Sequence, residues 1–347
     1  MNEPRNVLIV RTDRIGDVVL SLPLARIIKD RHPACRVSYL LRGYTRDLAL
    51  GHPSIDEVLV LRERNGRPDV DGNVALLRER AYDTAIAVYP TYRIARILRR
   101  AGIPERIGTG YRWYSLLFNR RAYQHRKEGT RHELDYNLHL LRYLGIENPD
   151  PAQVRFDLPV APESRRRVER VLSEAGVGSA RPLVIIHPGS GGSAVDLPLS
   201  RMRELTVRLS EEIDASVVVT GLASEAAACR EVAGDGMPSL AGKLDLGDLV
   251  ALIDRAEVLV ANSTGPIHVA AGLGKFVVGF YSRSPACSPV RWGPYTDRKA
   301  VFTPTLDCTG CTRKQCKRLR CMESIEVGEA FGAVRGALEG ARAGREA

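Results

Sequence analysis

The stretch that decides the fold lies at residues 7–23, VLIVRTDRIGDVVLSLP. It begins with an apolar, β-branched run, which indicates a buried strand over 6–11. A polar turn follows at 12–16, and the apolar residues after it recur at helical spacing, which predicts a helix over 17–29. Strand, tight turn and helix in this order are the opening of a β-α-β unit.

The same alternation of short strands and helices runs through the rest of the chain. Strands are predicted at 36–41, 58–61, 84–88, 182–187, 216–221, 258–261 and 276–281, and helices at 73–79, 133–144, 163–175, 200–213, 225–233, 246–256, 266–273 and 327–342. Four prolines between 149 and 162 mark a linker, after which the alternation restarts. The sequence therefore predicts an α/β fold of two Rossmann-like domains, 1–160 and 161–326, that face each other across a cleft.

Length and composition agree with a globular protein. Of 347 residues, 27% are charged and 44% are hydrophobic, which argues against a disordered chain or a fibre. The apolar runs are far shorter than the roughly 18 residues of a membrane span. Because the first residues also lack the apolar core and cleavage site of a secretory signal, we expect a cytoplasmic protein.

The positive charge is concentrated in the first half. The chain carries 51 Lys+Arg against 41 Asp+Glu, and residues 1–160 hold 27 of these bases and 19 of these acids. The densest part, 91–131, has 11 bases and two acids. Such a patch attracts an anionic partner or is only a solvated surface. No zinc-finger, RRM or KH motif accompanies it, so we expect no nucleic-acid partner.

The turn after the first strand contains the first candidate site, RTDRIGD at 11–17. In open α/β sheets, ligands bind at the carboxyl ends of strands, where this turn falls. Gly16 permits close approach of a backbone. Asp17 is interpreted either as a helix cap or as a general base for an acceptor hydroxyl, with Arg11 or Arg14 facing an anionic substrate.

Two loops of the second half suit an anionic ligand. HPGSGG at 187–192 offers glycine N–H groups to phosphate oxygens, although a flexible surface loop has the same composition. NSTGPIH at 262–268 joins a strand to a helix, where Ser263 and Thr264 would add hydroxyls to free N–H groups, that of Ile267 among them. Neither loop fits the dinucleotide or P-loop motifs, and together they favour a diphosphate group.

Four of the seven cysteines cluster near the C-terminus, in CTGCTRKQCKRLRC at 308–321. The C-x2-C spacing suits half of a four-thiolate metal site, but the two C-x4-C spacings are not a standard zinc pattern. Disulfides are rare in cytosolic proteins. The cluster is therefore interpreted either as a structural metal site, formed by Cys308, Cys311, Cys316 and Cys321, or as reduced thiols packed under a loop.

Taken in order, five stretches resemble glycosyltransferase family 9, the ADP-heptose:lipopolysaccharide heptosyltransferases and their relatives. They are VLIVRTDRIGDVVLSLP (7–23), HELDYNLHLLRYLGI (132–146), HPGSGG (187–192), NSTGPIHVAAGLG (262–274) and CTGCTRKQCKRLRCM (308–322). The resemblance implies a GT-B fold, with the acceptor on the first domain and the nucleotide sugar mainly on the second. It also implies that the last helix, 327–343, crosses back to the first domain, and that the reaction is inverting and needs no catalytic cofactor.

The resemblance gives roles to individual residues. Asp17 becomes the candidate catalytic base. The residues that would line the donor site are Gly189, Ser190, Glu225, Leu244, Ser263, Thr264, Gly265 and His268. The basic residues proposed to contact the acceptor are Arg11, Arg14, Arg62, Arg64, Arg93, Arg96, Arg120 and Arg121.

The chain departs from the family pattern in two places. Better-known heptosyltransferases have a lysine before the W-P that follows the HPG loop, whereas here residues 193–198 read SAVDLP. Ser263 stands where an aspartate is usual. Either Arg201 or the 12–14 loop supplies the missing positive charge, or the donor differs.

The expected function is transfer of a heptose from ADP-heptose to an anionic glycolipid such as the lipopolysaccharide inner core. The expected partners are that donor, that acceptor and, through peripheral contact, the cytoplasmic face of the inner membrane. Two alternatives remain open: a transferase of another nucleotide sugar to a non-lipid acceptor, and a non-catalytic nucleotide-sugar binding protein.

Overall fold

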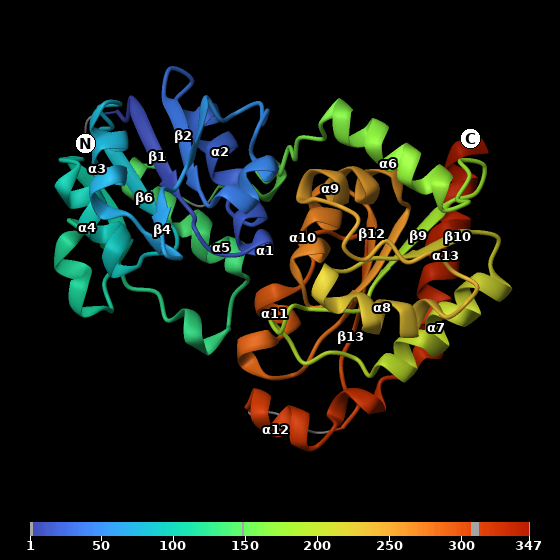
Figure 1. The fold of residues 1–347 in the computed structure, drawn as a ribbon. Coiled ribbons are helices and arrows are strands. Elements are labelled where there is room, and N and C mark those ends of the chain that lie inside the picture. The colour runs from blue at the N-terminus through green and yellow to red at the C-terminus, as the bar shows by residue number, and fades with distance from the viewer. Residues whose placement is uncertain (1–2, 148, 307–311, 347) are drawn as a thin grey trace. The chain divides into compact units, whose positions relative to one another are not determined.

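The computed structural model describes residues 3–147, 149–306 and 312–346. Contacts divide the chain into two compact units: Met1–Arg126 with Glu133–Pro159, and Lys127–His132 with Val160–Ala347. Each unit contains its own parallel sheet with helices packed on it, as Figure 1 shows. Two parallel sheets, each flanked by helices, confirm the predicted α/β fold class.

The first unit is built on a parallel sheet with the strand order β3-β2-β1-β6-β7-β8. Val7 and Ile9 of β1 are buried and pair with β2 on one side and β6 on the other, and such strands, covered on both faces, are apolar throughout. Its elements are β1 (Asn6–Val10), α1 (Ile15–Val19), α2 (Pro23–Arg31), β2 (Arg36–Leu41), η1 (Gly43–Leu48), β3 (Glu57–Val60), β4 (Glu63–Arg64), β5 (Arg67–Pro68), α3 (Val70–Arg78), β6 (Thr84–Ala87), α4 (Tyr92–Arg100), β7 (Glu105–Thr109), η2 (Trp113–Leu117), β8 (Arg120–Ala122), α5 (Glu133–Leu138), η4 (His139–Leu144) and η5 (Pro151–Gln153), with η3 (Arg126–Glu128) between the units.

The second unit has a parallel sheet with the order β10-β9-β11-β12-β13. Its central strands β9 and β11 are buried throughout, and Val184 of β9 pairs with Val258 of β11. Its elements are α6 (Pro162–Glu174), β9 (Leu183–His187), α7 (Leu199–Glu212), β10 (Ser216–Val219), η6 (Ala223–Glu225), α8 (Ala226–Ala233), α9 (Leu246–Arg255), β11 (Val258–Asn262), α10 (Gly265–Gly272), β12 (Phe276–Phe280), η7 (Pro285–Cys287), α11 (Pro289–Trp292), β13 (Lys299–Phe302), α12 (Arg313–Arg318), η8 (Cys321–Ser324) and α13 (Val327–Glu346).

The last helix corrects one expectation. The resemblance implied that residues 327–343 join the first domain, but α13 belongs to the second unit and packs on α7 and on strands β11, β12 and β13. Ala330, Val334 and Leu338 provide the reason, since they form an apolar stripe buried in the core of that unit. No helix within 3–147, 149–306 or 312–346 is long and apolar enough to cross a membrane.

Two local predictions also need correction. The single helix predicted at 17–29 is two helices, because Pro23 has no N–H to continue α1 and instead occupies the first turn of α2. Helix α4 was not predicted, because its arginines were interpreted only as a charged patch. Its buried residues, Ile94, Ala95, Ile97 and Leu98, form one apolar face beneath those arginines.

Candidate functional site

The loop after β1 lies at the switch point of the first sheet. The chain leaves β1 to form β2 and β3 on one side, and later returns to form β6 on the other side of β1. Loops diverge at such a point and leave a crevice at the carboxyl ends of the strands, where open α/β sheets bind ligands. The 11–17 loop therefore occupies the position that the sequence predicted for a site.

A buried arginine organises this loop. Arg11 is only 1% exposed. Its Nε donates to Oδ1 of Asp13 at 2.7 Å, and its Nη2 donates to Oδ1 of Asp17. The same Nη2 lies 3.6 Å from Oε1 of Glu133. One planar guanidinium thus holds three carboxylates, a geometry that a lysine would not provide.

Helix α5 completes the network from a distant part of the sequence. Arg126 Nη1 lies 2.5 Å from Oε1 of Glu133 and donates to Oδ1 of Asn137 at 3.2 Å. Asn137 also accepts from Arg11 at 3.4 Å and donates to the Leu20 carbonyl at 2.9 Å. Sequence reasoning gave no role to Glu133 or Asn137. Their signal was two polar residues, four positions apart, on an otherwise apolar helix face.

The network contains more carboxylates than arginines, and this imbalance acts on Asp13. Burial and the neighbouring Asp17 raise the pKa of Asp13 to about 7, although Arg11 opposes the shift. For Arg11, burial lowers the pKa, but Asp13, Asp17 and Glu133 together raise it above its ordinary value. Arg11 therefore stays charged, while Asp13 is the carboxyl in this site that titrates near neutral pH.

The raised pKa of Asp13 makes a prediction about stability. In the unfolded chain this carboxyl titrates near 3.8, so between pH 3.8 and about 7 the folded state binds more protons and stability falls as the pH rises. Asp13→Asn removes this loss. Urea unfolding should therefore show a stability advantage of Asp13→Asn over the wild type that grows from pH 4 to pH 8; a difference independent of pH would contradict the prediction.

The structure changes the interpretation of two predicted residues. Asp17 is not a helix cap: α1 begins at Ile15 with Arg14 in the cap position, and the Asp17 carboxylate, 16% exposed, bonds Arg11. Arg11 was expected to contact the acceptor, but its buried side chain is occupied by the carboxylates. Arg11 is therefore a positioning residue for Asp17.

A pocket of about 400 Å³ opens at the same edge of the first sheet. Thr12 comes from the loop after β1, Arg42 from the end of β2, and Tyr89 and Tyr92 from the segment after β6. Arg93, one of the arginines predicted to contact the acceptor, also lines this pocket. Tyrosine faces and arginine side chains suit a sugar that carries acidic groups.

The other predicted acceptor arginines are distributed over the first unit. Arg14, Arg64 and Arg96 are exposed. Arg62 donates to the Gly72 carbonyl at 3.2 Å. The remaining two are partly engaged: Arg120 with Glu105 at 2.5 Å, and Arg121 with the Phe118 carbonyl at 3.1 Å.

In the second unit the predicted donor loops meet at the switch point of its sheet. Strand β9 lies between β10 and β11, and the loops after β9, β10 and β11 begin at 188, 220 and 263. Asn262, fully buried, joins two of them: its Nδ2 donates to the Pro188 carbonyl at 2.6 Å and its Oδ1 accepts from Leu197 N at 2.8 Å. Sequence reasoning quoted this asparagine within a motif without giving it a role.

Glu225 connects the glycine-rich loop to the loop after β10. One carboxylate oxygen accepts from Gly191 N at 3.1 Å and the other from Leu222 N at 2.9 Å. A Cβ on Gly189 would lie 2.1 Å from Oε1 of Glu225, so a larger residue at this position would force the Glu225 carboxylate to move. Leu244 follows two residues after Gly242, whose N–H donates to the Gly221 carbonyl at 3.0 Å.

The remaining donor candidates lie around the start of α10. Gly265 begins the helix, and Thr264 precedes it with a hydroxyl that makes no cap hydrogen bond. The expectation of a free N–H at Ile267 is wrong, because this group donates to the Thr264 carbonyl at 3.2 Å. His268 is buried in the helix, with its ring 6.4 Å from that of Trp292.

Ser193 links the two serines of the donor set, Ser190 and Ser263, through their backbone carbonyls. Ser193 Oγ donates to the Ser190 carbonyl at 2.7 Å, with the Ser263 carbonyl 3.2 Å away as a second acceptor. Ser190 Oγ accepts from Ala194 N at 3.3 Å. Burial lowers the pKa of the nearby His187 to about 4, so this imidazole is neutral and bonds Thr220 at 2.9 Å.

The missing positive charge has a new candidate. Arg201, suggested by the sequence, pairs with Glu204 at 3.1 Å within α7. Arg283 follows the end of β12, next to β11, and is exposed. Among the described residues Arg283 has no ion-pair partner, so its charge is available to a ligand at the carboxyl edge of the sheet. Its signal in the sequence was its place two residues after a predicted strand.

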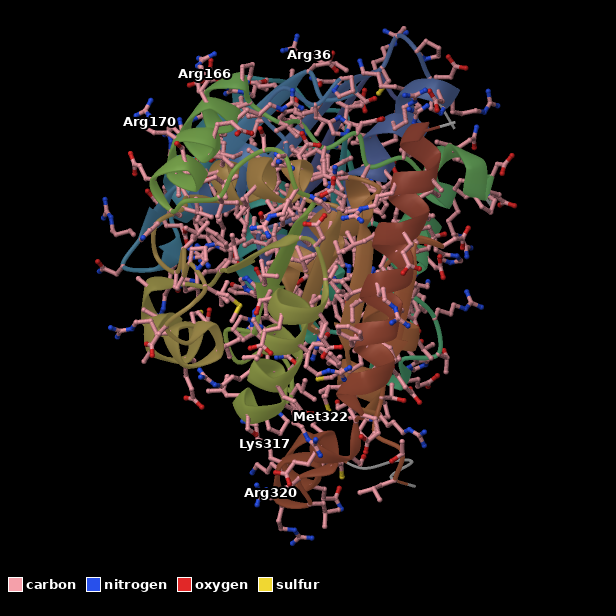
Figure 2. The ribbon with its side chains drawn as sticks, turned by 90° about the vertical axis from the view of Figure 1, so that its right-hand side faces the viewer. Arg36, Arg166, Arg170, Lys317, Arg320 and Met322 are labelled. Carbon is pink, nitrogen blue, oxygen red and sulfur yellow. The ribbon has the colours of Figure 1, made fainter. Side chains whose placement is uncertain are left out.

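The cysteine cluster is described only in part. Cys308 and Cys311 lie outside the described residues. Cys316 and Cys321 are buried in the apolar core with Met322, while Lys317 and Arg320 extend outward beside them, as Figure 2 shows. Among described residues, no group of three or more His, Cys, Asp or Glu is placed to hold a metal.

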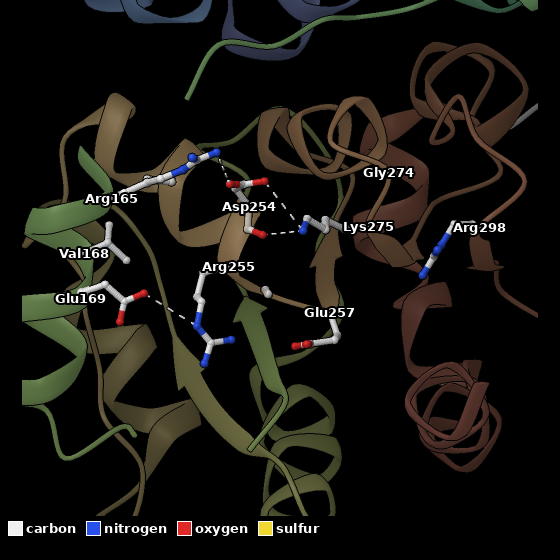
Figure 3. Close-up of a pocket in the computed structure, with 11 residues that line it drawn as sticks. Arg165, Val168, Glu169, Asp254, Arg255, Glu257, Gly274, Lys275 and Arg298 are labelled. Carbon is white, nitrogen blue, oxygen red and sulfur yellow. Dashed lines mark hydrogen bonds and ion pairs between the residues drawn. The ribbon is translucent and has the colours of Figure 1, made fainter. Parts of the chain in front are cut away.

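A second cavity, of about 490 Å³, lies at the opposite edge of the second sheet (Figure 3). Its wall includes Asp254, Glu257 and Lys275, which precede strands β11 and β12. Asp254 pairs with Arg165 at 2.9 Å and Glu257 accepts from Leu183 N at 2.8 Å. Because these are the amino ends of the strands, and Asp254 and Glu169 already pair with basic residues of the same wall, we do not place the donor there.

With this geometry in place, comparison with known proteins identifies the class. The model of the family described as "Glycosyltransferase family 9 (heptosyltransferase)" matches residues 74–321. The chain belongs to this family. It is a glycosyltransferase of the heptosyltransferase type.

Individual relatives agree along most of the chain. A putative glycosyltransferase of Haemophilus influenzae is 27% identical over 310 residues, 86% of this chain and 89% of that protein. A family 9 glycosyl transferase of Veillonella parvula superposes with a TM-score of 0.83 at 20% identity, over 97% of each chain. The ADP-heptose lps heptosyltransferase II of Escherichia coli superposes with 0.79 at 22% identity, over 97% of this chain and 99% of that one.

Proposed function

We propose that the protein transfers a heptose from ADP-heptose to an anionic glycolipid such as the lipopolysaccharide inner core, in the cytoplasm at the membrane face. The observation that carries the proposal is the partly exposed Asp17 carboxylate, which buried Arg11 holds at the carboxyl ends of the strands of the first sheet. A carboxylate so placed is suited to accept a proton from a sugar hydroxyl. Arg42 and Arg93 of the adjacent pocket supply charge for an acidic acceptor.

The proposed transfer is a single displacement. The acceptor oxygen forms a bond to the anomeric carbon, the bond from that carbon to the diphosphate oxygen breaks, and Asp17 takes the acceptor proton. The second unit holds the departing diphosphate through Ser190, Thr264 and the N–H group of Gly265, the first residue of α10. Glu225 is proposed to bond the ribose, while Leu244 contacts the base.

The test is a donor screen. We expect calorimetry to show binding of ADP but not of GDP or UDP, and we expect ADP release from ADP-heptose to require a Kdo-containing lipid. Binding of UDP or GDP instead would indicate another nucleotide sugar. ADP binding without release for any acceptor would support the non-catalytic alternative and overturn the proposal.

Gly189 provides a sharp test of the donor loop. The Cβ of Gly189→Ala would displace the Glu225 carboxylate, because the two groups would be 2.1 Å apart. The displaced carboxylate would lose its proposed contact with the ribose. A loss of about 1–3 kcal/mol, the usual size of an overpacking effect, corresponds to a Kd for ADP about 5- to 150-fold higher. Gly178→Ala is the matched control, since nothing lies within 4 Å of its Cβ. Equal ADP affinity in both variants would remove Glu225 from the site.

Arg283 is proposed to neutralise the diphosphate in place of the missing lysine. We expect Arg283→Ala to raise the Kd for ADP while leaving that for adenosine unchanged, because adenosine carries no phosphate. Arg298→Ala, which removes an exposed arginine at the amino edge of the same sheet, is the control. A loss of adenosine affinity as well would place Arg283 elsewhere in the site.

A structural metal at the cysteine cluster remains a proposal from spacing. The two described cysteines share one buried cluster, which agrees with thiol packing as well as with metal ligation. Elemental analysis of the purified protein is the test, with Cys308→Ser/Cys311→Ser as the control. We expect bound metal in the wild type that this variant loses; a metal-free wild type would leave reduced thiols as the interpretation.

A further inference from the structure

A basic and apolar surface of the first unit extends beyond the proposed acceptor pocket, with which it shares Tyr92 and Arg93. Residues 91–126 contain nine arginines and a single acid, Glu105. In α4 the apolar face is buried, so Arg93, Arg96 and Arg99 are exposed. Among the described residues, no carboxylate pairs with Arg93, Arg96 or Arg112. Within the described part of the chain their charge is therefore not neutralised.

Two large apolar side chains project beside these arginines. Trp113 and Leu116 lie on the 3₁₀ helix η2, in which residues three apart fall on the same face. They are 75% and 74% exposed, whereas Tyr114 and Leu117 pack on the core of the unit. The Trp113 ring contacts Tyr92 of α4 at 4.8 Å between centroids, which joins η2 to the start of the basic helix.

We propose that this α4–η2 surface, formed by Tyr92, Arg93, Arg96, Arg112, Trp113 and Leu116, binds the face of an anionic lipid bilayer. Tryptophan and tyrosine favour the membrane–water interface, where Leu116 also gains by leaving water. Each arginine near an anionic leaflet adds about 1 kcal/mol. The inference deepens the proposed function by naming the surface that meets the membrane, and it rests on that function for the position of the acceptor pocket. Vesicle binding itself requires neither donor nor catalytic base.

Charge and shape favour a bilayer over the other partners. A second copy of the chain would bring the same unpaired arginines against one another in a two-fold interface. A nucleic acid would match the charge, but the aliphatic Leu116 offers it neither stacking nor hydrogen bonds. Of these three partners, an anionic bilayer is the one that interacts favourably with both the arginines and the exposed Trp113 and Leu116.

The test is sedimentation of the full chain with vesicles of phosphatidylethanolamine and phosphatidylglycerol (3:1), or of phosphatidylcholine alone. We expect binding to the anionic vesicles only. Trp113→Ser/Leu116→Ser should lower the partition coefficient at least about tenfold, because two exposed anchors are removed. Arg93→Gln/Arg96→Gln/Arg112→Gln should lower it about a hundredfold. Trp113→Tyr should retain most of the binding.

Matched controls separate this surface from general effects. Leu50→Ser removes an exposed leucine of the same unit, and Arg166→Gln/Arg170→Gln removes two exposed arginines of α6 (Figure 2). Both should bind vesicles like the wild type, with all variants matched for thermal unfolding. Three results would overturn the proposal. The first is no vesicle binding by the wild type at low salt, and the second is equal vesicle binding by all variants. The third is that the surface variants keep vesicle binding but lose binding of an oligonucleotide, or lose self-association.

Discussion

Asp17→Asn is expected to lower the turnover number about 10²–10⁴-fold, the usual contribution of a general base. Asparagine keeps the size of the side chain and an oxygen for Arg11 Nη2, so the loop should retain its geometry. What is lost is the ability to take a proton. The Kd for ADP should stay unchanged, because the proposed donor residues lie in the second unit.

The measurement is the initial rate of ADP release at saturating donor and acceptor, with Asp30→Asn as the control. Asp30 is a carboxylate of the same unit that also pairs with an arginine, Arg26, but at the surface of α2. Its variant should turn over like the wild type. A rate for Asp17→Asn within threefold of the wild type, in a folded protein, would exclude Asp17 as the base.

The secondary structure was predictable where the spacing of apolar residues is not obscured by charged ones. Buried strands such as β1 are short apolar runs, and their positions were predicted to within a residue or two. Helix α4 was missed because four arginines among nine residues obscure the apolar face of Ile94 and Ile97. The family resemblance placed the last helix on the first domain, and the helical pattern of 327–342 could not correct this, because such a pattern does not specify the sheet on which a helix packs.

The site was predictable only in part, for a related reason. Loops at the carboxyl ends of strands are visible in a sequence, so the residues at 11–17, 187–192 and 262–268 could be selected. Contacts across the sequence are not visible: Glu133 lies 122 positions beyond Arg11. The sequence therefore indicated that Arg11 faces a substrate, whereas in the structure Arg11 is buried and bonds carboxylates of its own unit.

Arg11→Leu should have the largest effect on stability, lowering the free energy of unfolding by about 3–5 kcal/mol. The variant leaves Asp13, Asp17 and Glu133 without their shared cation, and Glu133 is almost fully buried. Arg11→Lys should recover only part of this loss, because one ammonium group does not reproduce the planar fork that reaches all three carboxylates. Urea unfolding at pH 7 measures both variants.

Arg26→Leu is the control for the predicted loss of stability in Arg11→Leu. Arg26 also pairs with two carboxylates of the first unit, Asp30 at 2.8 Å and Asp157 at 3.4 Å, but its side chain is 34% exposed. Solvent screens such pairs, so their loss should cost only about 0–1 kcal/mol. Equal costs for the two leucine variants would mean that burial does not strengthen the Arg11 network. A larger cost for Arg11→Leu that Asp13→Asn partly restores would show that the excess of carboxylates is what Arg11 holds in check.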